Sequence, residues 1–228
     1  MTKNLQNKKI IIANWKMAPE TIGEAFEILK KVKNPARTLK NTKVVICPPS
    51  LYINELKESV GKTKKILFGV QNIFSEEKGS HTGEVSIDMV KNLGMEYVIV
   101  GHSERRALGE DDIIVSKKLN LVLNSKLNPI LCVGEKERNE EGNFLLFISE
   151  QIKNSLQGVE KKYLKNLIIA YEPIWAIGKT AQDAMDSRGV HQMHLFIKKV
   201  LKDLFDEKIA EKVAIIYGGS VELENVED

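Results

Sequence analysis

One carboxylate in this sequence stands directly after an apolar run, where a strand is expected to end. The run covers residues 167–171, Leu-Ile-Ile-Ala-Tyr, and Glu172 follows it. Pro173 comes next, and because proline lacks a backbone N–H it cannot continue a strand ladder. A carboxylate fixed at a strand end can act as a general base.

The segment after Glu172 is unusually apolar for a loop. Residues 173–180 read P-I-W-A-I-G-K-T, so Trp175, Ala176 and Ile177 stand where loops usually carry polar side chains. Gly178 supplies a flexible backbone joint. These features predict a lid that excludes water from the carboxylate. The alternative is a buried connection in which Trp175 only packs.

Three further apolar runs also end in polar groups or glycine. They are closed by Asn14 and Lys16, by His102, and by Gly218, Gly219 and Ser220. Four strands therefore deliver groups that could act on a small molecule. Taken singly, Lys16 could be a solvated surface lysine and His102 a core histidine at a strand end.

Four motifs carry a resemblance to a known family. N-W-K-M at residues 14–17, V-G-H-S-E-R-R at 100–106, Y-E-P-I-W-A-I-G at 171–178 and Y-G-G-S-V at 217–221 resemble triosephosphate isomerase in order and spacing. The resemblance covers about residues 9–221. It implies interconversion of dihydroxyacetone phosphate and glyceraldehyde 3-phosphate, a glycolytic and gluconeogenic step, through an enediolate and without a cofactor or metal.

The resemblance also implies catalytic roles. In that family a glutamate is the base and a neutral histidine polarises the carbonyl, which gives these roles to Glu172 and His102. Lys16 would stabilise the anionic intermediate electrostatically, and Asn14 would orient groups around it. Glu104 is similar to the family's buried partner of the lysine, although it could instead be an exposed carboxylate at a helix start.

Further residues match the family's substrate-binding parts. The phosphate contacts implied are Gly178, Gly218, Gly219 and Ser220, because glycine allows close approach and backbone N–H groups can face an anion. The lid would be Pro173, Trp175, Ala176, Ile177, Gly178, Lys179 and Thr180, and Tyr217 resembles the residue that latches it closed. Cys132 is similar to a cysteine near the base, but packing explains it equally well.

The polar segment 71–84 resembles the family's long third loop, which enters a neighbouring subunit. Thr82 would then approach Asn14 and Glu104 of another copy. The implied assembly is a homo-oligomer, at least a dimer. A mobile surface insertion is the alternative.

The elements that must position these residues follow an α/β pattern. Apolar runs at residues 9–13, 43–47, 65–70, 97–101, 129–133, 167–171 and 213–217 alternate with amphipathic segments, which predicts parallel strands joined by helices. With the resemblance, this predicts an incomplete TIM-type (β/α) barrel of about seven units, as one domain over residues 1–228. The family's eighth strand, with a phosphate-binding glycine pair, is not expected here. The seam that this leaves between the first and seventh strands would favour an oligomer larger than a dimer, and the missing glycine pair would weaken phosphate binding. The same departure from the family leaves open an alternative function, as an inactive barrel relic or an assembly module.

The composition of the chain argues against a nucleic-acid-binding protein and against a membrane protein. With 34 basic and 31 acidic side chains the net charge is only +3, which gives no support for nucleic-acid binding. No apolar segment approaches the length of a membrane span or signal peptide, so a cytoplasmic protein is expected. Cys47 and Cys132 lie in apolar strands, which favours buried reduced thiols. The alternative within the enzymes is a barrel of the same kind that acts on another phosphorylated aldose or ketose.

Overall fold

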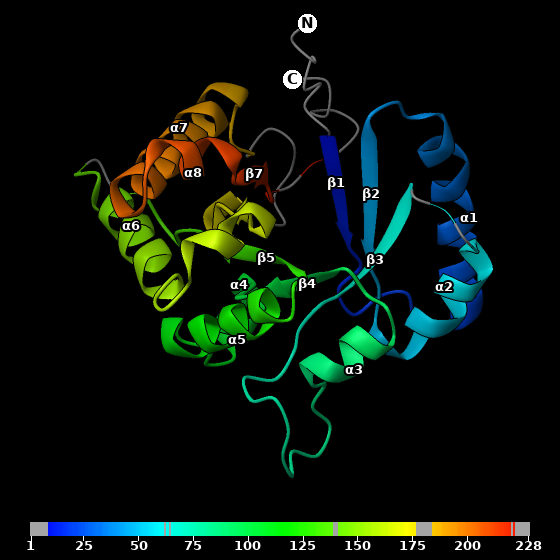
Figure 1. Ribbon diagram of the computed structural model, residues 1–228. Coiled ribbons are helices and arrows are strands. Elements are labelled where there is room, and N and C mark those ends of the chain that lie inside the picture. Colours follow the sequence, from blue (N-terminus) through cyan, green and yellow to red (C-terminus); the bar gives the residue numbers. More distant parts are fainter. Residues whose placement is uncertain are drawn as a thin grey trace, which may run out of the picture.

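A curled sheet of seven parallel strands forms the centre of the computed structural model, and helices lie on its outer side (Figure 1). The structure describes residues 9–61, 63, 65–138, 141–176, 184–219 and 221. Strand order in the sheet follows sequence order, and every neighbouring pair is parallel. Parallel neighbours need crossover connections. The result is a partly closed TIM-type barrel of seven units.

The strands occur where the apolar runs predicted them. Each predicted boundary agrees with the structure to within one residue, since β-branched and apolar side chains suit a sheet covered on both faces. The strands are β1 (Lys9–Asn14), β2 (Thr42–Cys47), β3 (Ile66–Val70), β4 (Tyr97–Val100), β5 (Asn128–Val133), β6 (Ile168–Tyr171) and β7 (Ala214–Tyr217).

The helices begin at polar caps. Thr21, Asp111 and Asp186 each accept a backbone N–H from the first turn of the helix that follows. The helices are α1 (Ile22–Thr38), α2 (Ile53–Val60), α3 (Ile87–Asn92), α4 (Ser103–Ala107), α5 (Asp112–Asn124), α6 (Asn143–Ser155), α7 (Ser187–Leu204) and α8 (Glu207–Lys212), with 3₁₀ turns η1 (Ser50–Tyr52), η2 (Lys161–Asn166) and η3 (Ile174–Ala176). None of the helices in the described ranges is long and apolar enough to cross a bilayer.

Both faces of the central strands β2 to β6 are buried, by different partners. Along β4, Val98 and Val100 belong to a core shared with the helices, whereas Tyr97 and Ile99 belong to a second core formed by strand residues alone. Successive side chains of a strand point to opposite faces. The second core therefore fills the concave side of the sheet and supports the strand ends from within.

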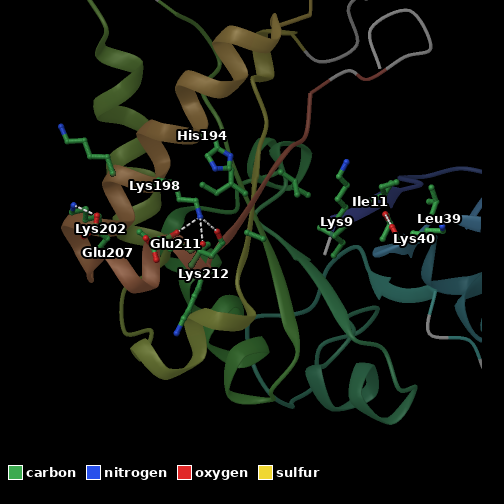
Figure 2. Close-up of a pocket in the computed structure, with 18 residues that line it drawn as sticks. Lys9, Ile11, Leu39, Lys40, His194, Lys198, Lys202, Glu207, Glu211 and Lys212 are labelled. Atoms are coloured by element: carbon green, nitrogen blue, oxygen red, sulfur yellow. Dashed lines mark hydrogen bonds and ion pairs between the residues drawn. The ribbon is translucent and has the colours of Figure 1, made fainter. Parts of the chain in front are cut away.

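An open seam separates β1 from β7. These strands are the two ends of the sheet order, and a cavity of about 1300 Å³ lies between them (Figure 2). Ile11 of β1 is 51% exposed there. Six lysines and two glutamates are among the lining residues. One of these, Lys198, donates to the carbonyl oxygens of Ala210, Glu211 and Val213 and so closes the end of α8.

Candidate active site

The candidate site lies where β1, β4 and β6 end. Glu172 directly follows β6, His102 lies two residues beyond β4, and Lys16 lies two residues beyond β1. The backbone N–H of Glu172 donates to the carbonyl of Val133 at 2.8 Å, which extends the β5–β6 pairing by one bond. A Cβ on Gly134 would lie 1.7 Å from the Glu172 carbonyl oxygen, so only glycine allows this approach.

The Glu172 carboxylate is buried beside polar groups. Its side chain is 7% exposed, and its Oε1 lies 3.6 Å from Nε2 of His102. Its Oε2 accepts the backbone N–H of Ser103 at 3.3 Å. Ser103 is the first residue of α4, whose N-terminal end favours negative charge. A carboxylate held in this way is well placed to take a proton from a bound molecule.

His102 is the N-cap of α4, and this fixes its tautomer. Its Nδ1 accepts the backbone N–H of Glu104 at 3.2 Å. A ring nitrogen that accepts a hydrogen bond carries no proton, so the remaining proton of a neutral ring is on Nε2. Nε2 is also the atom nearest Glu172. The structure therefore brings a hydrogen-bond donor and a carboxylate within 3.6 Å of each other.

Lys16 is held by a contact of its backbone and a contact of its side chain. Its backbone N–H donates to Oδ1 of Asn14 at 3.0 Å, and its Nζ contacts Oε1 of Glu104 at 2.6 Å. The hydrogen bond from Lys16 lowers the pKa of Glu104. The predicted pair thus forms, but Glu104 is not buried as the resemblance implied, because its side chain is 59% exposed in this single chain. As a solvated pair it adds only about 0–1 kcal/mol to stability.

The first part of the predicted lid is anchored to a buried carboxylate. Trp175 Nε1 donates to Glu135 at 2.9 Å, and Tyr171 and Arg138 donate to the same carboxylate at 2.8 Å. Pro173 and Ala176 are buried. The remaining lid residues Ile177, Gly178, Lys179 and Thr180 lie outside the described residues.

Sequence reasoning did not identify Glu135, although a signal was present. Glu135 stands just beyond β5, in L-C-V-G-E, as Glu172 stands beyond β6. Gln71, which directly follows β3, was noted only as the start of a loop. The strand-end pattern that identified the other site residues also covers these two positions.

The end of β7 brings Gly218 next to Glu172. Gly218 donates its N–H to the Tyr171 carbonyl at 2.8 Å, and a Cβ on Gly218 would lie 3.0 Å from Cγ of Glu172. A Cβ on Gly219 would lie 2.2 Å from the Tyr217 hydroxyl. That hydroxyl is buried, which raises the pKa of Tyr217, and the backbone of Met185 beside it acts in the opposite direction. Ser220 lies outside them, so its predicted phosphate contact has no structural counterpart here.

Two further residues were predicted from the sequence, Cys132 and Thr82. Cys132 is buried on the concave face, and burial together with the nearby Glu172 charge raises the pKa of its thiol well above its usual range. Both cysteines are free, as expected. Thr82 is exposed on the loop between β3 and α3, which projects from the body of the molecule (Figure 1).

Comparison with known proteins gives one consistent result. The sequence model of the family described as "Triosephosphate isomerase" matches residues 9–228. A triosephosphate isomerase of Dictyoglomus turgidum is 41% identical over 226 residues, with 97% of this chain and 88% of the relative covered. Relatives of the same name from Alkaliphilus metalliredigens and Clostridium botulinum (strain Langeland) are 40% and 42% identical, and 87% and 84% of their lengths are covered.

Proposed function

The chain belongs to the triosephosphate isomerase family and is an isomerase, and on that basis we propose its mechanism and the role of each residue. It interconverts dihydroxyacetone phosphate and D-glyceraldehyde 3-phosphate through an enediolate. Glu172 is the base that moves the proton between the two carbons. The observation that carries this proposal is the buried Glu172 carboxylate 3.6 Å from Nε2 of His102.

The three groups act on different parts of the reaction. Glu172 removes the proton from the carbon beside the carbonyl, while the Nε2–H of His102 donates to the carbonyl oxygen as negative charge develops on it. Lys16 and Asn14 hold the anionic substrate and intermediate. His102 then passes a proton to the former carbonyl oxygen and takes up the proton of the neighbouring hydroxyl, while the Glu172 carboxyl protonates the neighbouring carbon. The isomerisation is thus complete with no net change in protons or electrons.

Phosphate binding and protection from water complete the proposal. Gly219, Ser220 and Gly178 contact the phosphate through backbone N–H groups. Gly218, whose own N–H donates to the Tyr171 carbonyl, lets the phosphate approach closely, and Tyr217 latches the lid over residues 173–180. The Tyr217 hydroxyl is buried beside the backbone of Met185, in the segment that follows the lid in sequence, and this position supports that role. A homodimer in which Thr82 of one copy approaches Asn14 and Glu104 of another belongs to the same proposal.

A second candidate function has one observation in its favour. Among the described residues, β1 and β7 have no strand partner on the side that faces the seam, which a relic or an assembly module would tolerate better than an enzyme.

A coupled assay of both reaction directions on the purified protein separates the two functions. We expect turnover with triose phosphates that rises linearly with enzyme concentration and is inhibited by inorganic phosphate. A folded protein without turnover would leave only the second candidate.

A further inference from the structure

Lys16 adopts a backbone conformation that needs external support. Its φ is +54°, in the left-handed region that residues with a side chain seldom adopt. Such conformations persist only where surrounding contacts fix them, and they occur preferentially at functional sites. One contact is local, from the Lys16 N–H to Asn14. It holds the nitrogen side of the residue and leaves the carbonyl side to another partner.

That partner is the side-chain amide of Gln71. Its Nε2 donates to the Lys16 carbonyl at 2.8 Å and to the Cys47 carbonyl at 2.9 Å. The Cys47 carbonyl also accepts the N–H of Trp15 at 3.0 Å. A single amide, standing just after β3, therefore ties together the segments that follow β1 and β2. It uses both of its N–H groups to do so.

Gln71 is itself held in place by a buried polar network. The next residue, Asn72, accepts a hydrogen bond from Nζ of Lys118 at 2.8 Å. Lys118 is 3% exposed and contacts Oε1 of Glu110 at 2.6 Å. Arg105 donates to the same oxygen at 2.7 Å. The start of this loop is thus fixed to α5 and to α4, the helix that carries Glu104.

We propose that Gln71 is a positioning residue, which holds the Lys16 backbone so that the ammonium group is aimed at the site. The proposal rests on the proposed function of Lys16. An ammonium group stabilises developing charge only where it is correctly placed, and a displacement of about 1 Å can cost up to about a hundredfold in rate. Gln71 acts through Lys16 and touches no reacting atom.

The test replaces the amide with a side chain of similar length. Gln71→Met removes both N–H donors, and Gln192→Met on the exposed face of α7 is the matched control. We expect Gln71→Met to lower kcat/KM by about ten- to a hundredfold, with most of the loss in kcat. The control should match the wild type, and the melting temperature of Gln71→Met should fall by only a few degrees.

A double-mutant cycle separates positioning from general structural support. In a Lys16→Met background, measured at high enzyme concentration, Gln71→Met should cause no further loss, because the group it positions is gone. An equal loss in both backgrounds, or unchanged kcat in the single variant, would overturn the proposal.

A crystal structure of Gln71→Met gives a readout that does not depend on activity. We expect Lys16 to leave the left-handed region or to lose its contact with Glu104. A wild type without turnover would refute the proposed function alone. An unchanged Lys16 in the variant crystal would refute the role of Gln71 whatever the activity.

Discussion

In the proposed mechanism, the chemistry depends on Glu172. It is buried, and its two carboxylate oxygens lie near His102 and the backbone N–H of Ser103. Glu172→Gln keeps the shape but cannot take up a proton, so we expect turnover to fall by about 10²- to 10⁴-fold while the protein stays folded. Steady-state kinetics measure the loss, with Glu55→Gln on the surface of α2 as the control. Near wild-type turnover would refute the assignment of the base.

The two cysteines give a prediction about pH. Burial raises the pKa of Cys47 to about 12, whereas an unfolded thiol ionises near about 8.5. The folded state therefore holds a proton that the unfolded state releases, and this contribution to stability is lost as pH rises from about 8.5 to about 12. Native protein should not react with a thiol reagent at pH 9, and unfolded protein should react at both cysteines. Rapid reaction of native protein would contradict the buried, protonated state.

At the scale of elements, the strand ends show what the sequence could and could not predict. Strand positions followed from apolar runs, and Lys16, His102 and Glu172 were found at or just beyond the ends of these runs. Other residues, such as Glu104 and Thr82, came from the family resemblance, and neither source led to Glu135 or Gln71. The conformation of Lys16 and its support by Gln71 were not predictable, because a positive φ has no signal in a lysine and a loop amide has many possible partners. For Glu104 the sequence left burial and exposure both open, since the outcome depends on what covers α4 in three dimensions.

The anchor of the lid can be tested separately from catalysis. Glu135 is 2% exposed and accepts from Trp175, Tyr171 and Arg138. Glutamine keeps an acceptor oxygen but removes the negative charge that faces Arg138, so we expect Glu135→Gln to lower the free energy of unfolding by about 1–3 kcal/mol. Urea unfolding at pH 7 measures this. Glu137→Gln, two residues further on and exposed, is the matched control, and equal stability of the two variants would exclude the anchor.

At the scale of the whole molecule, the two exposed features differ in their suitability for assembly. The seam presents Ile11 but is lined by six lysines, and like charges oppose the pairing of two identical seams. The loop that carries Thr82 has a smaller excess of charge, with three glutamates and one lysine between β3 and α3, against six lysines and two glutamates at the seam. We therefore expect a dimer formed through this loop rather than through the seam.

Sedimentation at micromolar concentration tests this assembly. The wild type and an Ile11→Lys variant should both sediment as dimers, whereas Thr82→Arg should give monomers and Thr82→Ser should not. Association that is lost in Ile11→Lys and strengthened by salt would indicate pairing at the seam, because salt screens the lysines. A monomeric wild type would refute the dimer.

Transfer of solvent hydrogen to carbon tests the central claim most directly. In D₂O, a proton held by Glu172 can exchange with solvent before it returns to carbon, so the product should carry deuterium at the carbon next to the carbonyl. Proton NMR of triose phosphates turned over by the wild type and by Glu172→Gln measures this. We predict deuterium in the wild-type product and a rate lowered at least a hundredfold in the variant, a factor of the order expected for a general base. Product formed without any deuterium, at the same rate by both proteins, would contradict the account.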